Sequence, residues 1–266
     1  MSLRESLRSL AWLAIGLGVA AGAAFWQASY NRSLAQTRFD AMSRRAAEQV
    51  AARMHAFEYG LRGARGAVIA AGGEAGITRL RFAQYSASQD IEREFPGSSG
   101  FGFVRRVPID QEAAFIAAAR LDGKPDFHLH QLGPNEGERF VIQYFEPSDS
   151  AVPAIGLDLA SEPRRRAAAE RAMQSGEIAM TAPITLVQAS PGPRSVLLLL
   201  PIYRIETPLD ALKQRDRRSM PARGTHEQTI GWIYTPVVPA EVLKDFDFEG
   251  GEFAIRLTDA TDGGEP

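Results

Sequence analysis

The sequence predicts an α+β protein with an N-terminal transmembrane helix, a long stalk helix and a globular part built on antiparallel strands. Three observations support this fold class. Residues 9–31 contain no charged side chain. Residues 28–71 carry apolar side chains in steps of three and four, the spacing of one face of a helix. After residue 77, short helical segments and strand-like runs follow one another between Gly and Pro turns, which is typical of an α+β sheet.

A transmembrane helix is predicted over residues 9–30. Its central part, residues 10–26, consists almost entirely of Ala, Leu, Gly, Ile and Val. That length is close to the roughly 20 residues that span a bilayer as an α-helix. The aromatic residues suited to the two membrane interfaces are Trp12, Trp26 and Tyr30.

A cleaved signal peptide is the alternative interpretation of this segment. Two arginines precede the apolar run, and small residues within 22–28 offer places for a cut. We favour an uncleaved anchor, because the aromatic residues of this region fit a cleavage site poorly. Residues 1–8 would then form a cytoplasmic tail, and the long domain after the helix would lie outside the cytoplasm.

The stalk helix is predicted over residues 31–75 and ends at Gly72-Gly73. Its narrow apolar stripe resembles a coiled-coil seam and predicts a homodimer. The alternative is that the helix packs along its own domain, and both interpretations can hold at different heights. The stripe consists of Phe39, Met42, Ala46, Val50, Met54, Phe57, Leu61, Ala64 and Val68.

The globular part is predicted to contain short helices and strands in mixed order. The expected helices cover residues 77–95, 110–121 (N-cap Asp110, stop at Asp122-Gly123), 164–174 (N-cap Ser161, stop at Gly176) and 239–246. The expected strands cover residues 101–107, 126–132, 139–145, 154–159, 178–188, 194–203, 230–238 and 252–258. The polar segment 204–228, with two prolines, is predicted to be a loop.

Composition narrows the function classes. A net charge of −2 without a clustered basic surface gives no support for nucleic-acid binding. The absence of cysteine excludes disulfides, a zinc–thiolate site and a cysteine nucleophile. His128 and His130 have metal-ligand spacing but no evident third ligand, so neither a metal nor a cofactor is predicted. We found no catalytic motif. A membrane-anchored hydrolase using acidic residues is kept as an alternative, as is a stalk protein without ligand.

Three segments resemble the CHASE domain, the extracytoplasmic sensory module of bacterial and plant receptors that include the cytokinin receptors. The main segment runs from Asp158 to Pro183, with Asp158-Leu-Ala-Ser-Glu-Pro-Arg at its start and Met180-Thr-Ala-Pro at its end. The others are Ser99 to Val104 and Leu198 to Tyr203. The resemblance is good over residues 85–205.

The resemblance implies a receptor in which the stalk is followed by two PAS-like lobes. A distal ligand-binding lobe would cover residues 78–205, and residues 206–266 would form an incomplete proximal lobe. The implied location is the inner membrane with the domain in the periplasm, and we expect a second span beyond residue 266. No catalysis is expected in residues 1–266. The implied output domain is a histidine kinase, a diguanylate cyclase or phosphodiesterase, or an adenylate cyclase.

Asp158 is the strongest candidate for a ligand contact. A carboxylate in an apolar run is unfavourable unless something donates to it. Either local N–H groups satisfy it, or it faces a pocket and accepts from a ligand. The resemblance implies the second: Asp158 falls on an aspartate that binds a purine ring, and Met180 on a residue whose backbone touches the ring. The expected ligand is an adenine-type or other heterocycle with N–H donors. Further wall residues, chosen from strand position, are Phe103, Tyr144, Thr181 and Leu198.

Overall fold

The computed structural model describes residues 3–147, 154–186, 194–204, 228–242 and 244. It has the predicted fold class, with a long N-terminal helix and an antiparallel sheet. The chain divides after Ala51 into an N-terminal unit and a second unit that contains the sheet. Predictions for the loop over 204–228 and the strand over 252–258 fall almost entirely outside the described residues.

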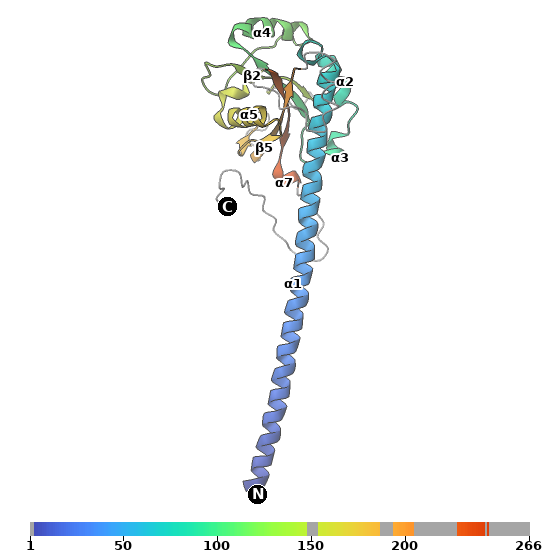
Figure 1. The fold of residues 1–266 in the computed structure, drawn as a ribbon, viewed down its shortest axis with the longest axis vertical. Helices are drawn as coiled ribbons and strands as arrows, with labels where there is room; N and C mark the ends of the chain where they lie inside the picture. Colours follow the sequence, from blue (N-terminus) through green and yellow to red (C-terminus); the bar gives the residue numbers. More distant parts are fainter. Residues whose placement is uncertain (1–2, 148–153, 187–193, 205–227, 243, 245–266) are drawn as a thin grey trace. The chain divides into compact units, whose positions relative to one another are not determined.

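Helix α1 (Leu3–Ala70) is continuous and includes both the predicted transmembrane segment and the predicted stalk (Figure 1). Among the described residues it is the one helix whose length and apolar composition would allow it to cross a membrane. A signal sequence near an N-terminus meets the same criterion. The helix ends where predicted, because Gly72 has a φ of 98°, a left-handed conformation that L side chains rarely adopt.

The sheet of the second unit has the strand order β2-β1-β6-β5-β3, with the short β4 paired to β5. All of these pairs are antiparallel. Its strands are β1 (Phe101–Val107), β2 (Arg139–Glu146), β3 (Ala179–Met180), β4 (Ile184–Thr185), β5 (Arg194–Tyr203) and β6 (Thr229–Val237). All nine residues of β6 are buried, which fits its place between β1 and β5.

Short helices connect and cover these strands. The α-helices after α1 are α2 (Arg79–Ser86), α3 (Ile91–Glu94), α4 (Glu112–Leu121), α5 (Pro163–Ser175) and α7 (Pro239–Val242). The 3-10 helices are η1 (Gly73–Ala75), η2 (Ile109–Gln111) and η4 (Leu159–Ser161). The predicted helix over 77–95 is therefore two helices, α2 and α3, separated by a turn.

The sheet has a separate apolar cluster on each face. On one face the last turns of α1 contribute Phe57, Leu61, Ala64 and Val68, which pack with β1, β5 and β6. The other face is covered by α5, which contributes Ala168, Ala169, Ala172 and Met173. The alternative that α1 packs along its own domain is therefore confirmed for its last turns. Phe57 and Leu61 belong to this core, so the stripe as a whole is not a dimer seam.

Two predicted strands are wrong. Residues 154–156 form a turn, and Leu157 and Asp158 make only isolated pairs with His130 and Val141. Residues 126–132 lead from a turn at Asp126 to a bend at Leu132 and form no ladder, apart from that His130 pair. An apolar run or an alternating pattern indicates burial, but a strand also needs successive backbone pairs, and these two segments make only isolated ones.

Other differences concern boundaries. The predicted strand over 178–188 is divided into β3 and β4, and the structure does not describe its end. The N-cap of α5 is Glu162, whose carboxylate accepts from the backbone N–H groups of Arg164 and Arg165, and Gly176 ends the helix as predicted. β6 lies between β1 and β5, so this strand shares a sheet with the predicted distal lobe although the boundary at 205/206 assigned it to the proximal one.

Candidate functional site

Two charged side chains are buried in the described part of the second unit, and both lie in the segment formed by η4 and α5. Asp158 has no exposed surface and Arg165 has 3% of its surface exposed. A buried charge strongly destabilises a fold unless hydrogen bonds or an opposite charge compensate it. The partners of these two residues therefore indicate what each one does.

The carboxylate of Asp158 accepts four hydrogen bonds from the protein. Oδ1 accepts from the backbone N–H groups of Phe140, at 2.9 Å, and Ala160, at 3.0 Å. Oδ2 accepts from the side-chain amides of Asn135, at 2.8 Å, and Gln131, at 3.1 Å. Both oxygens thus have two donors each, which is the usual acceptor capacity of a carboxylate. This geometry agrees with the alternative in which protein N–H groups satisfy Asp158.

The donors of Asp158 are themselves held in place. The side-chain amide of Asn135 also donates to the carbonyl oxygen of Glu138, at 3.1 Å. Its oxygen accepts from Arg166, whose Nε donates to the carbonyl of Ala160, at 2.8 Å. Ser161, predicted as an N-cap, instead donates to the carbonyl of Asp158, at 2.6 Å. The network ties the segment before β2 to η4.

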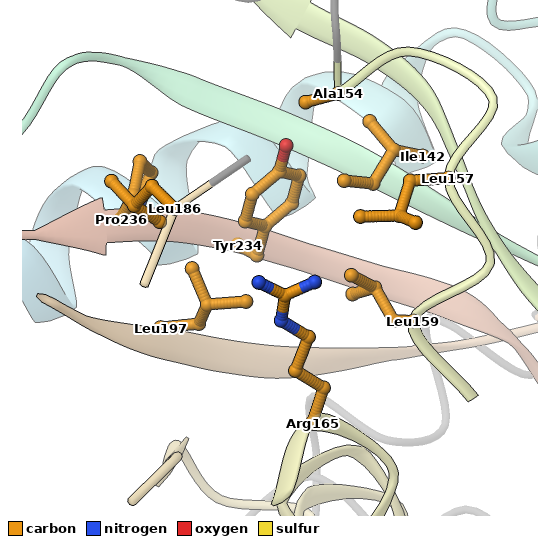
Figure 2. Close-up of a pocket in the computed structure, with 9 residues that line it drawn as sticks. All are labelled: Ile142, Ala154, Leu157, Leu159, Arg165, Leu186, Leu197, Tyr234 and Pro236. Carbon is orange, nitrogen blue, oxygen red and sulfur yellow. The ribbon is translucent and has the colours of Figure 1, made fainter. Parts of the chain in front are cut away.

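A pocket lies on the α5 side of the sheet, next to this network (Figure 2). Its cavity volume is about 10 Å³, which is room for roughly one water molecule. Leu157 and Leu159, the two neighbours of Asp158, both line it. The full lining is Ile142, Ala154, Leu157, Leu159, Arg165, Leu186, Leu197, Tyr234 and Pro236.

Arg165 reaches from α5 into this otherwise apolar lining (Figure 2). Its Nη2 donates to the carbonyl oxygen of Thr185, at 3.0 Å, whereas its Nε and Nη1 make no hydrogen bond within the described structure. Glu162 Oε2 lies 4.0 Å from Nε, and the carboxylate of Glu162 is already engaged with two backbone N–H groups. Burial lowers the pKa of the Arg165 guanidinium.

Tyr234 is the second polar residue of the lining. It comes from the central strand β6, opposite Gly102 of β1, where any side chain would collide with the tyrosine ring. Its hydroxyl has no hydrogen-bond partner among the described residues, and burial raises its pKa. The pocket thus combines a guanidinium with two free donor nitrogens, a free hydroxyl and an aliphatic wall.

The structure does not gather the six residues predicted for the site. Asp158 lies beside the cluster on the α5 side, between Leu157 and Leu159. The residues on the α1 side of the sheet are Phe103, Tyr144, Leu198 and Met180. Thr181 is fully buried and exchanges hydrogen bonds with the backbone of Leu197, at 2.9 Å in each direction.

Tyr144 has a structural environment on the α1 side. Its hydroxyl donates to Asp122 Oδ2, at 2.5 Å, and its ring lies 5.4 Å from the Arg79 guanidinium carbon. Burial and then the Asp122 carboxylate raise the pKa of Tyr144. These contacts hold α2 and the end of α4 against β2.

Sequence reasoning missed Arg165 and Tyr234 as pocket residues. Three consecutive arginines, residues 164–166, are typical of the solvent-facing side of a helix. A usable signal exists, because Arg165 stands in the i, i+3, i+4, i+7 series with the buried Ala168, Ala169 and Ala172. Nothing comparable marks Tyr234, since every residue of its strand is buried.

A comparison with protein-family models finds the CHASE domain, matched over residues 75–266. The chain belongs to the CHASE domain family. The match confirms the resemblance inferred from the segments at 99–104, 158–183 and 198–203. A search of curated proteins finds no match for the chain. CHASE domains are extracytoplasmic sensory domains of receptors, and the candidate span in α1 agrees with such a setting.

Proposed function

We propose that this chain is the ligand-sensing input part of a transmembrane receptor, with the CHASE domain in the periplasm and α1 anchored in the inner membrane. The observation that carries the proposal is the pocket on the α5 side, where a sensory domain keeps a buried arginine with free donor groups. The pocket has room for about one water molecule, so a ligand would require the α5 side of the sheet to open.

Asp158 contributes to this site by shaping its wall. The carboxylate holds η4 against the segment before β2, and its neighbours Leu157 and Leu159 line the pocket. Direct contact between Asp158 and an N–H donor of a heterocycle stays a prediction from the family resemblance. Such a ligand would have to displace one of the four protein donors, and this requirement can be tested by mutation.

The remaining parts of the receptor follow from the family resemblance. We expect PAS-like lobes, a homodimer through the stalk and an output domain of the histidine kinase or nucleotide cyclase or phosphodiesterase type. Part of the stripe on α1 remains available for a dimer, since Phe39 and Met54 are exposed by 54% and 37%. Ligand-dependent movement of the sheet would be passed to α1 through its last turns.

Topology is tested with reporter fusions after Pro266. Alkaline phosphatase, which is active only outside the cytoplasm, should be active in a bacterial host, and β-galactosidase at the same position should be inactive. The fusion should remain in the membrane fraction. Cleavage near residue 24 or 28, seen by N-terminal sequencing of the mature protein, would contradict the anchor.

Ligand sensing is tested with the full chain in detergent micelles. A thermal-shift screen should contain adenine derivatives, other neutral heterocycles, amino acids and small organic acids. At least one class should raise the melting temperature in a saturable manner, because a ligand that binds only the folded state stabilises it. Absence of any saturable shift across all classes would contradict a small-molecule sensor.

A further inference from the structure

The parts of the chain that cover the pocket on the α5 side are held in place with different firmness. Helix α5 is fixed, since Ala169 has no exposed surface and its carbonyl oxygen accepts from Trp232 Nε1, at 2.9 Å. The segment η4 is held by the Asp158 network described above. The third part is the segment over residues 183–186, here called the strap, whose Leu186 lines the pocket. The attachments of the strap therefore decide whether the pocket can open.

The strap is attached to the sheet by one short pairing. The two residues of β4 belong to it, and they pair with two residues at the start of β5. Before the strap, Thr181 is fully buried and exchanges hydrogen bonds with the backbone of Leu197, at 2.9 Å in each direction. Between these two attachments, Ala182 and Pro183 belong to no strand, and Pro183 has no N–H to donate. The link between these two residues thus separates a firmly held part of the chain from the strap.

The side chains of the strap alternate between the interior and the solvent. Ile184 and Leu186 point inward and are 6% and 8% exposed, whereas Pro183 and Thr185 are exposed. Ile184 and Leu186 both belong to the apolar cluster on the α5 side. Displacement of the strap takes only these two apolar side chains out of the cluster. Such a local opening exposes far less apolar surface than unfolding of the domain, so it requires less free energy.

Two arginines at the start of α5 fasten the strap. Arg164 Nη1 donates to the carbonyl oxygen of Pro183, at 2.8 Å, and Arg165 Nη2 donates to the carbonyl oxygen of Thr185, at 3.0 Å. Arg164 is exposed, so water competes for its bond to the strap and the net contribution of that bond is small. When the strap leaves, Arg165 loses its acceptor at Thr185. The same movement therefore enlarges the pocket and frees the guanidinium.

We propose, building on the function proposed above, that the strap is a lid of the pocket, hinged at Ala182-Pro183 and fastened by Arg164 and Arg165. The closed state has room for about one water molecule, so a ligand binds to the state in which Leu186 has left the lining (Figure 2). The apparent affinity of such a ligand is reduced by the fraction of molecules in which the strap is open. Binding keeps the strap away from the edge of β5, which makes the strap the first element to respond.

The test measures opening by the reaction of a buried thiol with N-ethylmaleimide, on the full chain in detergent micelles, which has no cysteine of its own. Leu197→Cys places the thiol in the pocket lining, and Leu199→Cys places it in the same apolar cluster but outside the lining. The two leucines, both on β5, are 3% and 0% exposed. The thiol at position 197 should react about tenfold faster or more, because the strap uncovers only this position. Equal rates would show that both thiols report unfolding of the whole domain, and would overturn the proposal.

The matched variants are Arg164→Met and Arg171→Met, each combined with Leu197→Cys. Both arginines are exposed on α5 and donate to a backbone carbonyl, Arg164 to that of Pro183 and Arg171 to that of Met180, at 2.7 Å. Pro183 belongs to the strap, whereas Met180 lies before the hinge. Arg164→Met should accelerate labelling by about two- to tenfold, the effect of losing one hydrogen bond. Arg171→Met should leave the rate unchanged, and equal acceleration in the two variants would contradict the hinge.

A second reporter position keeps the test independent of one substitution. Melting curves of the two cysteine variants show whether each folds cooperatively. If Leu197→Cys does not, Leu159→Cys takes its place, at a position that is 1% exposed and belongs to the same lining. The expected result is unchanged, with labelling at position 159 faster than at position 199 and accelerated by Arg164→Met.

The outcomes also distinguish this inference from the proposed function, because labelling with N-ethylmaleimide needs no ligand. If the pocket thiol reacts faster but no compound class in the thermal-shift screen raises the melting temperature, the lid stands and the sensor is wrong. If a compound class raises the melting temperature while the thiols at positions 197 and 199 react at equal rates, the sensor stands and the lid is wrong.

Discussion

The two faces of the sheet are built for different purposes. The α1 side is packed with aliphatic and aromatic side chains, including Phe57 and Leu61 of the helix, and every polar group of Tyr144 has a protein partner. The α5 side has an equally apolar cluster but also contains the buried charges Asp158 and Arg165. One face therefore packs against the long helix, while the other contains the buried charges on which the proposed ligand site depends.

On the α5 side, the two buried charges differ in how many hydrogen-bond partners the protein gives them. Asp158 has four protein donors for its two oxygens. Arg165 has one protein acceptor within hydrogen-bond distance. A buried charge with a complete set of partners holds structure, and one with free donors is available for a ligand. The predictions below test this division, beginning with the largest expected effect.

Asp158→Ala should lower the stability of the ligand-free domain by about 3–5 kcal/mol, because three buried donors and the side-chain amide of Gln131 lose their acceptor. For a domain of this size that corresponds to a fall in melting temperature of roughly 6–20 °C. Asp110→Ala, at an exposed position, is the control and should change little. A ligand-free melting temperature that stays unchanged, together with lost ligand binding, would instead support the direct contact implied by the family resemblance.

Leu61→Ala tests the α1 side. Leu61 has no exposed surface, and truncation of a buried leucine costs about 2–5 kcal/mol. Tyr59, two residues earlier on the same helix and 75% exposed, is the matched control, and Tyr59→Ala should cost less than about 0.5 kcal/mol. Denaturant titration of both variants measures the difference. Similar small effects would mean that the last turns of α1 do not belong to the core.

Alkaline pH should destabilise the domain through the buried tyrosines 144 and 234. Their pKa values are raised in the folded state, chiefly by burial, so their full stabilising contribution is present below the unfolded pKa of about 10. Above that pH the unfolded chain loses these protons first, and each tyrosine costs up to about 1.4 kcal/mol per pH unit. Melting temperatures from pH 8 to pH 11 should fall, and less steeply in Tyr234→Phe. An identical slope in this variant would contradict burial of the hydroxyl.

The smallest effect on stability is expected in the exposed part of the α1 stripe. Phe39→Cys and Met54→Cys should change the unfolding free energy by less than about 0.5 kcal/mol. If the stalk forms a parallel dimer, each should still give a disulfide-linked dimer in this cysteine-free chain under mild oxidation. Leu61→Cys should not, because the side chain is buried in its own domain. A crosslink at residue 61 and none at 39 or 54 would reverse this assignment of the stripe.

The fold was predictable wherever local patterns decide the structure. The apolar steps of the long helix, the left-handed glycines at 72 and 176, and the β1 and β5 strands all agree with the structure. The family assignment was also predictable, because it rests on the segment from Asp158 to Pro183. Patterns failed at 126–132 and 154–159, where the backbone makes only isolated pairs, His130 with Leu157 and Asp158 with Val141, in place of a regular strand.

The candidate site was predictable only in part. The segment containing Asp158 was found, because a lone carboxylate in an apolar run is visible in the sequence. Its donors Gln131 and Asn135 were not, since they come from an irregular segment more than twenty residues earlier. The face of the sheet on which each wall residue lies depends on register and on the bulge between Phe103 and Val104. Sequence spacing alone does not determine either of them.

The central position of β6 has a consequence for how ligand binding would be passed on to the long helix. Neighbouring residues of a strand point to opposite faces, and here Tyr234 belongs to the pocket while Ile233 belongs to the cluster that contains the last turns of α1. An occupant of the pocket is thus one peptide bond away from the packing surface of the long helix. A signal on this route would travel as a small shift of one buried strand, without the closing of two lobes.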